Sequence, residues 1–172
     1  LISSKGKDGF YKGETQEKFI KAMAENNGFI SSDDFASYKT NIGSPLISSY
    51  RGNYVFSAGP PSGGGLVVST SLNILNGFNL NKYGSNSAAT YHLLAEALRR
   101  GHNNRSHHMG DPNYYNVPMS ALLSKERTLE FIKTINLKKA TNSSKIKPLD
   151  IKNESRNTTN YSIVDKDRNT NT

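Results

Sequence analysis

Two adjacent threonines, Thr158 and Thr159, are residues whose chemistry depends on whether the backbone beside them is intact. They stand in the stretch ESRNTTNYSIVD, between a charged segment without periodicity and a short alternating run. A threonine hydroxyl inside a chain is a poor nucleophile because no base lies beside it. At a chain terminus its own α-amine, with a pKa of about 7.7 to 8.0, can take the proton. Cleavage of the Asn157–Thr158 bond would therefore turn Thr158 into a nucleophile.

Histidines near the middle of the chain are a second candidate for chemistry. His102, His107, His108 and Asp111 lie close together in the sequence, and imidazoles with a carboxylate can bind a metal. No two of the histidines have the i, i+4 spacing of a helical ligand pair, and they stand at the expected end of a helix, where polar residues are common. This pattern favours a polar turn, so we predict no metal site.

Three consecutive glycines, Gly63, Gly64 and Gly65, precede an apolar run. Backbone N–H groups at such a helix start can bind an anion. The stretch lacks the Lys-Ser/Thr of a phosphate loop and the glycine spacing of a dinucleotide loop. We therefore predict that these glycines serve close packing against a neighbouring element.

Helices must position most of these residues. Apolar spacing predicts one helix over ETQEKFIKAMAENNG, ended by Gly28, and another over SNSAATYHLLAEALRRGHNNRS. In the second, the spacing i, i+3, i+4, i+7 is filled by Tyr91, Leu94, Ala95 and Leu98. Ser31 or Ser32 is a cap residue for a short helix over residues 33–38. The stretch SKERTLEFIKTI predicts a last helix, whose apolar side comprises Leu129, Phe131, Ile132 and Ile135.

Turn residues mark the remaining structure. Two β-rich runs around Arg51 and Gly52 predict a hairpin over residues 45–57. Residues 66–75 favour a buried helix, although Val67, Val68 and Thr70 leave a strand open. GDPNY from Gly110 is a turn.

The stretch before the threonine pair lacks any periodicity. We expect residues 137–156 to form a long exposed linker, because lysine, asparagine and serine dominate there and unstructured connections of this length are usually functional or disordered. Such a linker would leave the next peptide bond accessible. Beyond it, the alternation from Tyr161 to Val164 predicts a half-buried strand.

Composition limits the possible classes of protein. The 172 residues are 34% hydrophobic, enough for one ordinary domain, and contain no cysteine for disulfides or thiolate sites. The net charge of +8 is dispersed, without the basic stripe of a nucleic-acid-binding protein, so no nucleic-acid partner is expected. No apolar run is long enough to span a membrane. The absence of an initiator Met and the end just after a predicted strand favour a fragment of a larger protein.

Seven stretches, read in order, resemble bacterial-type members of the γ-glutamyltransferase (glutathione hydrolase) family. They are FYKGETQEKF, GFISSDDFASYK, YRGNYVFSAGPPSGGG, LNILNGFNLNKYG, AEALRR, GDPNYYNVP and ESRNTTNYSIVDKD. The matches are collinear over nearly the whole chain, which makes the set far more specific than any one motif.

This resemblance implies an α/β (α+β) fold, incomplete here, from the αββα sandwich of N-terminal-nucleophile hydrolases. Residues 1–157 would be the C-terminal part of the large subunit, and residues 158–172 the start of the small subunit. The family's precursor cuts itself before a threonine, which matches the Asn157–Thr158 bond. Thr158 would be the catalytic nucleophile and its new α-amine the base, while Thr159 matches the family's second threonine.

The resemblance also implies the partners. Substrates would be glutathione and other γ-glutamyl compounds, with water or acceptor amino acids or peptides resolving the γ-glutamyl ester, and no cofactor is implied. The remainder of the large and small subunits would supply the substrate-binding and oxyanion groups, so we assign no substrate-binding residue here. Family members are periplasmic, extracellular or on the cell surface.

Some residues depart from the family pattern. Asn160 replaces a common histidine, NNR at residues 103–105 replaces ADR, and the end DKDRNTNT differs from the usual strand. We therefore expect this polypeptide alone to be inactive. Two alternatives remain open: a truncated, non-catalytic homologue that persists as a binding or pseudo-enzyme domain, and a cephalosporin or glutaryl acylase of the same fold.

Overall fold

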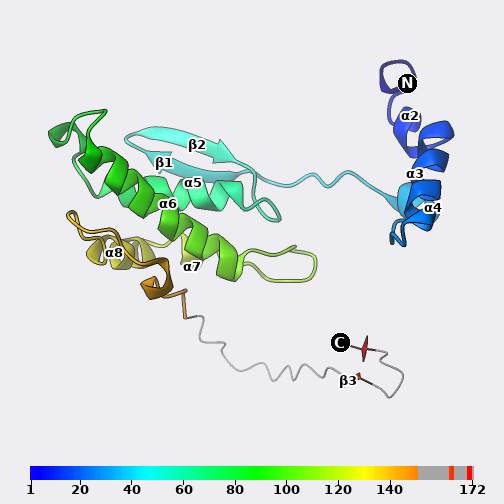
Figure 1. Ribbon diagram of the computed structural model, residues 1–172. Helices are drawn as coiled ribbons and strands as arrows, with labels where there is room; N and C mark the ends of the chain where they lie inside the picture. Colours follow the sequence, from blue (N-terminus) through cyan, green and yellow to red (C-terminus); the bar gives the residue numbers. More distant parts are fainter. Residues whose placement is uncertain (151–162, 165–169, 172) are drawn as a thin grey trace. The chain divides into compact units, whose positions relative to one another are not determined.

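The structure, a computed structural model, describes residues 1–150, 163–164 and 170–171 (Figure 1). The chain divides into two compact units, Leu1–Gly43 and Ser44–Thr172. The first unit is helical, and the second combines helices with β-hairpins. Within the described part of the chain, no helix has both the length and the apolar character needed to cross a bilayer.

The first unit contains four helices: α1 (Ile2–Lys5), α2 (Asp8–Tyr11), α3 (Glu14–Glu25) and α4 (Ser32–Ser37). The predicted helix from Glu14 is confirmed. Its end differs in detail from the prediction, because Asn27 rather than Gly28 takes the left-handed conformation, with φ of 55°. The amide of Gly28 then donates to the carbonyl of Met23 at 2.7 Å, which satisfies an otherwise unpaired helix-end carbonyl.

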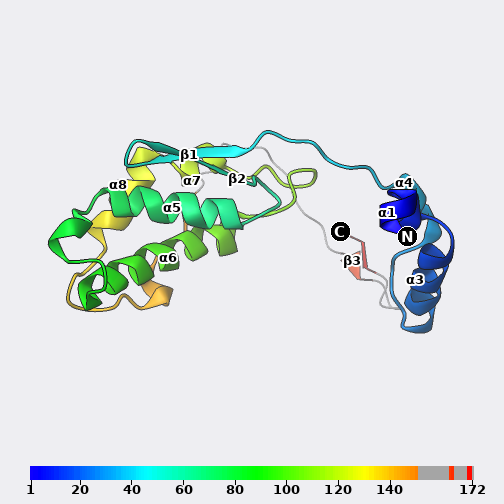
Figure 2. The ribbon, with the colours of Figure 1, turned by 90° about the horizontal axis from the view of Figure 1, so that it is seen from above.

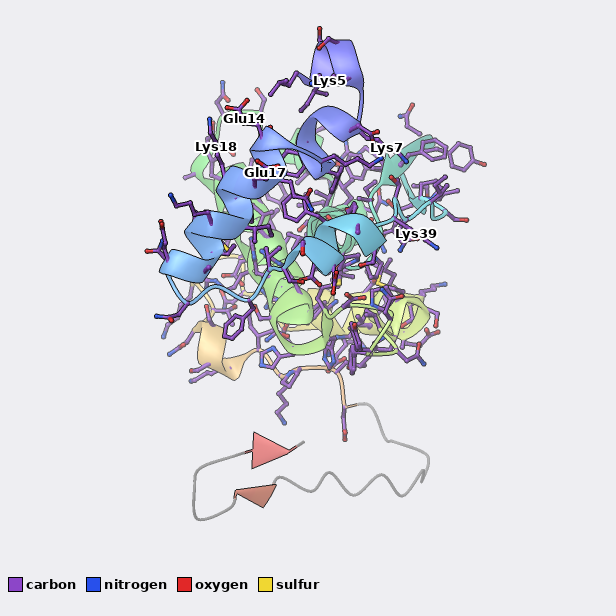
Figure 3. The ribbon with its side chains drawn as sticks, turned by 90° about the vertical axis from the view of Figure 1, so that its right-hand side faces the viewer. Lys5, Lys7, Glu14, Glu17, Lys18 and Lys39 are labelled. Carbon is purple, nitrogen blue, oxygen red and sulfur yellow. The ribbon has the colours of Figure 1, made fainter. Side chains whose placement is uncertain are left out.

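Helix α4 begins where its cap predicts. The hydroxyl of Ser31 accepts from the amide of Asp34, whose carboxylate accepts in turn from the Ser31 amide at 2.7 Å, a complete capping box. This helix buries Phe35, whose ring stacks on Phe10 with centroids 5.6 Å apart. On α3, Figure 3 shows Glu14 and Lys18 on the same side of the helix, where their charged atoms lie 2.7 Å apart in solvent.

The predicted hairpin over residues 45–57 is confirmed. Strands β1 (Leu46–Tyr50) and β2 (Asn53–Ser57) are antiparallel, with Leu46 opposite Ser57 and Tyr50 opposite Asn53. The two turn residues, Arg51 and Gly52, have φ of 50° and 83°. Positive φ at both positions is what a two-residue turn between right-handed twisted strands requires, and glycine at the second supplies it without strain.

Helix α5 (Gly64–Asn76) is the central layer of the second unit, which decides the helix-or-strand question for residues 66–75. Figure 2 shows the hairpin on one side of α5 and α6 (Ala88–His108) on the other. The hydroxyl of Ser69 on α5 donates to that of Ser48 on β1 at 3.0 Å. A methyl group added at Gly65 would lie 2.3 Å from the carbonyl oxygen of Ala58, so the prediction of close packing is confirmed for this glycine. It is wrong for Gly64, where the nearest atom would be 3.9 Å away.

Helix α6 packs through a face that differs from its apolar stripe. The helix itself is confirmed, but Tyr91, Leu94 and Leu98 are 58%, 39% and 37% exposed. Leu93 and Ala97 are buried instead, and Gly101 lies so close to α5 that a methyl group there would be 2.8 Å from the Val67 carbonyl. Small residues let the two helices approach each other.

Two further helices, α7 (Met119–Leu122) and α8 (Lys125–Lys133), complete the helical part, with short 3₁₀ turns η1 (Leu80–Lys82) and η2 (Ser143–Lys145). The GDPNY turn is confirmed by hydrogen bonds from the Tyr114 and Tyr115 amides to the Asp111 carbonyl. Helix α8 buries Phe131, but Leu129, assigned to the same apolar side, is 45% exposed. The main core is formed by Ile74, Leu75, Leu93, Ala97, Phe131 and Ile146.

Near the C-terminus, β3 (Ile163–Val164) pairs antiparallel with β4 (Thr170–Asn171), with Ile163 opposite Asn171. The predicted strand is therefore confirmed at Ile163 and Val164. The proposed cleavage residues Asn157 and Thr158, together with Thr159 and Asn160, lie outside the described residues.

Candidate functional site

Residues 141–149, which lead toward the predicted cleavage bond, are held by five side chains. We call these side chains the clamp: Glu96, Arg99, Asn103 and His108 on α6, and Arg127 on α8. Each makes a hydrogen bond to a backbone atom of residues 141–149. Residues 137–149 are mostly exposed, as expected for this linker, although Ile146 is buried. The sequence did not indicate that contacts with distant residues hold the backbone of residues 141–149, a segment that has no periodicity of its own.

Glu96 binds the first residue of the held segment, Thr141. Its carboxylate accepts the Thr141 amide at 2.9 Å through Oε1 and the Thr141 hydroxyl at 2.6 Å through Oε2. The neighbouring Arg99 guanidinium donates to the Thr141 carbonyl. Both polar groups of the Thr141 backbone are thus satisfied by one turn of α6.

Glu96 is charged and buried, with only 1% of the residue exposed. Burial by itself raises the pKa of this carboxyl. The hydrogen bonds from Thr141 and the Arg100 guanidinium, at 2.6 Å, outweigh burial and lower the pKa to about 2. Arg100 is also fully buried, and its Nη2 donates to the Thr134 hydroxyl at 2.8 Å. The pair therefore links α6 to the end of α8 and to the held segment.

Three more clamp contacts follow along the segment. The Asn103 amide group donates to the carbonyl of Ile146 at 3.0 Å, and Ile146 inserts its side chain into the core. Arg127 donates through Nη2 to the carbonyl of Lys147 at 2.8 Å. These contacts fix the backbone on both sides of the Ile146–Lys147 peptide bond.

Arg127 is held rigidly enough to act as an anchor. Its side chain is buried, its guanidinium lies over the Phe131 ring with Cζ 4.0 Å from the centroid, and its Nη1 donates to Glu130 at 2.8 Å. Its Nη2 also reaches the Asn104 side-chain oxygen at 3.5 Å. A planar guanidinium can make these contacts in several directions at once, which a lysine ammonium in this position could not reproduce.

His108 makes the last clamp contact. Its Nε2 accepts the amide of Leu149 at 3.2 Å, which requires a neutral ring with its proton on Nδ1. Burial, followed by the positive charges of His107 and Arg127, lowers the pKa of His108. The neutral form is thus the one that the surroundings favour.

The histidines considered as metal ligands have separate partners. His107 lies within 2.9 Å of the Asn103 carbonyl through Nδ1, and His108 binds Leu149. In the part of the chain that the structure describes, no three His, Cys, Asp or Glu side chains are grouped as a metal site.

The comparisons with known proteins identify the family of this chain. A family model described as Gamma-glutamyltranspeptidase matches residues 1–171. The chain belongs to the gamma-glutamyltranspeptidase family.

Sequence relatives and solved structures support this membership. The chain is 43% identical over 169 residues to a "Glutathione hydrolase proenzyme" of Pseudomonas sp. (strain A14), covering 98% of this chain and 29% of that relative. It resembles the crystal structure of the Helicobacter pylori gamma-glutamyltranspeptidase with a TM-score of 0.79 and 35% identity, over 91% of this chain and 45% of that one. A cephalosporin acylase from Bacillus halodurans follows, with a TM-score of 0.69 and 28% identity, over 78% and 25% of the two chains.

These likenesses confirm the expected fold class: a mixed α/β part of the gamma-glutamyltranspeptidase sandwich. The chain spans about 29% of the length of the glutathione hydrolase proenzyme of Pseudomonas sp. (strain A14).

Sequence reasoning missed the clamp, although one signal was present. Four polar residues of α6, Glu96, Arg100, Asn104 and His108, recur every fourth position and are all buried. A polar stripe at helical spacing is normally a solvent-facing side, and only the partners on other elements identify it as buried.

Proposed function

We propose that this chain is part of a gamma-glutamyltransferase (glutathione hydrolase) precursor that cuts itself between Asn157 and Thr158. Residues 1–157 would then be the C-terminal part of the large subunit, and residues 158–172 the start of the small subunit. The observation that carries this proposal is the family match over residues 1–171, which includes the stretch ESRNTTNYS. The name "proenzyme" given to the Pseudomonas relative is in line with a processed precursor.

The proposed cleavage begins with the hydroxyl of Thr158. Its oxygen attacks the carbonyl carbon of Asn157, the peptide nitrogen leaves with a proton as the amine of Thr158, and an ester joins the two residues. Water then opens the ester to give a carboxylate at Asn157 and a restored hydroxyl. The products are two chains, and Thr158 now carries an α-amine.

That amine supplies the base for catalysis. With a reference pKa of about 7.7 to 8.0, a substantial fraction is unprotonated near neutral pH, and it can take the hydroxyl proton directly or through a water. The hydroxyl oxygen attacks the γ-glutamyl carbonyl of glutathione or a related amide and expels the amine, leaving a γ-glutamyl ester on Thr158. Water yields glutamate, or an amino acid or peptide takes the acyl group. No cofactor enters these steps.

An acylase is the second candidate, supported by the likeness to the Bacillus halodurans cephalosporin acylase. Both candidates use the same self-cleavage and differ in the acyl group accepted. The test compares a γ-glutamyl anilide with a glutaryl anilide, using the full-length precursor after processing and its Thr158→Ala variant. We expect release from the γ-glutamyl substrate by the wild type only. Preference for the glutaryl substrate would identify an acylase, and no release from either would favour a non-catalytic homologue.

A further inference from the structure

The first unit, Leu1–Gly43, buries very little apolar surface of its own. Among residues 1–43, all of which the structure describes, Phe35 is the only buried hydrophobic side chain, at 8% exposure. Units of about 40 residues usually need a disulfide, a metal or an associated chain to be stable. The chain has no cysteine, and its described part contains no group of three His, Cys, Asp or Glu side chains that could hold a metal. An associated chain segment is therefore the remaining way to stabilise this unit.

Aromatic rings surround Phe35 and are still open to solvent. The ring centroids of Phe10 and Phe19 lie 5.6 Å and 5.3 Å from that of Phe35. Tyr11 also contacts Phe35, at 5.8 Å, and its other neighbour is the stacked ring of Tyr38 at 5.3 Å. Phe10 is 36% exposed and Tyr38 is 64% exposed. The unit thus presents a connected aromatic cluster that it cannot cover by itself.

A groove of about 550 Å³ opens beside these rings. We call it the aromatic groove; its lining includes the rings of Tyr11, Phe35 and Tyr38 and the side chains of Lys7, Lys12 and Lys39. Binding pockets have volumes of roughly 300 to 1,000 Å³. The aromatic groove can therefore accept apolar side chains of another chain segment.

The lysines give the aromatic groove a positive rim. Lys12 lies 3.0 Å from Asp8, whereas Lys7 and Lys39 have no acidic partner among the described residues. Figure 3 shows Lys7 and Lys39 on the opposite side of the unit from Lys18. A segment that fits this rim carries carboxylates beside its apolar side chains.

Charge also argues against two possible sources of that segment. Residues 44–172 include 16 basic and 8 acidic residues, so the second unit matches a positive rim poorly. A second copy of the chain, with a net charge of +8, matches it no better. The chain covers only 29% of its Pseudomonas relative, so most of a precursor of that kind lies outside these residues.

We propose that the aromatic groove is the docking site for an acidic segment with apolar side chains, which belongs to the same precursor and lies outside residues 1–172. This inference rests on the part of the proposed function that places the chain in a longer precursor. The first unit needs its cover permanently, and a segment of the same polypeptide provides this, whereas a dissociating ligand does not.

The test uses the full-length precursor with Thr158→Ala, which keeps every segment in one polypeptide. A carbodiimide joins lysine amines to the carboxylates that they contact, and peptide mass spectrometry of the monomer band identifies the joined residues. Lys18 is the internal control, because it lies 2.7 Å from Glu14 and should form that local link in every sample. Hydrogen exchange at the amides of residues 35–40 is a second measurement.

We expect links from Lys7 or Lys39 to Asp or Glu residues outside residues 1–172. Removing both charges with Lys7→Gln and Lys39→Gln should speed exchange over residues 35–40 about fivefold, because docking weakens. The matched control, Lys18→Gln with Lys21→Gln, removes the same charge from α3 and should leave this exchange unchanged.

Links only to residues 44–172 or to a second copy would overturn the proposal. Absence of any link from Lys7 and Lys39, beside a normal link between Lys18 and Glu14, would overturn it too, as would equal exchange in the two double variants. None of these results depends on cleavage, so the proposed function would stand. A wild-type precursor that is never cut before Thr158 would overturn the proposed function, while links to residues outside 1–172 would still support docking.

Discussion

Thr141 is bound twice by the carboxylate of Glu96, through its amide nitrogen at 2.9 Å and its hydroxyl at 2.6 Å. The same carboxylate pairs with Arg100 at 2.6 Å inside the protein. One buried charge on α6 thus neutralises a buried guanidinium and also begins the held segment that leads toward Thr158.

Replacing Glu96 with Gln should destabilise the second unit strongly. The substitution leaves the Arg100 guanidinium, which is 0% exposed, without its counter-charge. Removing one partner of a buried ion pair costs about 3 kcal/mol or more. Urea unfolding of the 172-residue chain, followed by circular dichroism, measures this loss.

Glu14→Gln is the matched control for that experiment. Glu14 pairs with Lys18 at nearly the same distance, 2.7 Å, and with the same i, i+4 spacing, but both side chains are exposed. Solvent screens such a pair, so the unfolding midpoint should not change measurably. Equal effects of the two substitutions would show that burial does not decide the strength of the Glu96 pair.

The chain should lose stability in acid because of Glu96. Its pKa is about 2 in the folded protein, against an ordinary value of 4.5. Between these two pH values the Glu96 carboxyl is protonated in the unfolded chain but still charged in the folded protein, so acid favours unfolding. The stabilisation that charged Glu96 gives the folded state is therefore fully present above about pH 5 and is lost as the pH falls toward 2. The loss is on the order of 3 kcal/mol. The difference in unfolding free energy between wild type and Glu96→Gln should shrink over this range; a constant difference would contradict the assignment.

Acid should also release the Leu149 amide. The folded-state pKa of His108 is lowered by burial and then by the positive charges of His107 and Arg127, while Lys147 and Asp150 are the charged residues beside Leu149. The contact is therefore present above a pH of about 6.5 and is lost as the pH falls through the lowered pKa, because a protonated ring cannot accept. Hydrogen exchange at Leu149, with the intrinsic pH effect subtracted, reports the loss. In His108→Gln, whose amide oxygen accepts at every pH, this pH-dependent step should disappear.

Gly65→Ala should lower the stability of the fold and Gly64→Ala should raise it slightly, although the two glycines are adjacent. A methyl group at Gly65 would lie 2.3 Å from the Ala58 carbonyl, whereas at Gly64 the nearest atom would be 3.9 Å away. We expect a cost of about 2 kcal/mol at Gly65 from overpacking and a small gain at Gly64 from helix propensity. Thermal unfolding of the two variants measures both. Similar melting temperatures would mean that packing against Ala58 does not require the glycine.

Much of the fold could be predicted because its signals are local. The hairpin follows from the two β-rich runs on either side of Arg51 and Gly52, and α4 follows from its Ser31 cap. The close packing at Gly65 was also predicted, because the sequence lacks the companions of a phosphate loop. In each case, neighbouring residues carry the information.

The clamp could not be predicted because its partners are far apart in the sequence. Glu96 and Thr141 are separated by 45 residues, and His108 and Leu149 by 41. The apolar spacing of Tyr91, Leu94 and Leu98 indicated the helix correctly, yet these side chains are exposed in the described structure. Tertiary contacts instead determine which face of α6 is buried. That face includes the polar stripe of Glu96, Arg100, Asn104 and His108.

The cleavage bond itself is the most direct test of the account. Intact mass and N-terminal sequencing of the full-length precursor should show two chains, the smaller beginning Thr158-Thr159-Asn160, and Thr158→Ala should leave one uncut chain. A wild-type protein that releases γ-glutamyl products while it remains a single polypeptide would contradict the central claim, as would normal splitting of the alanine variant.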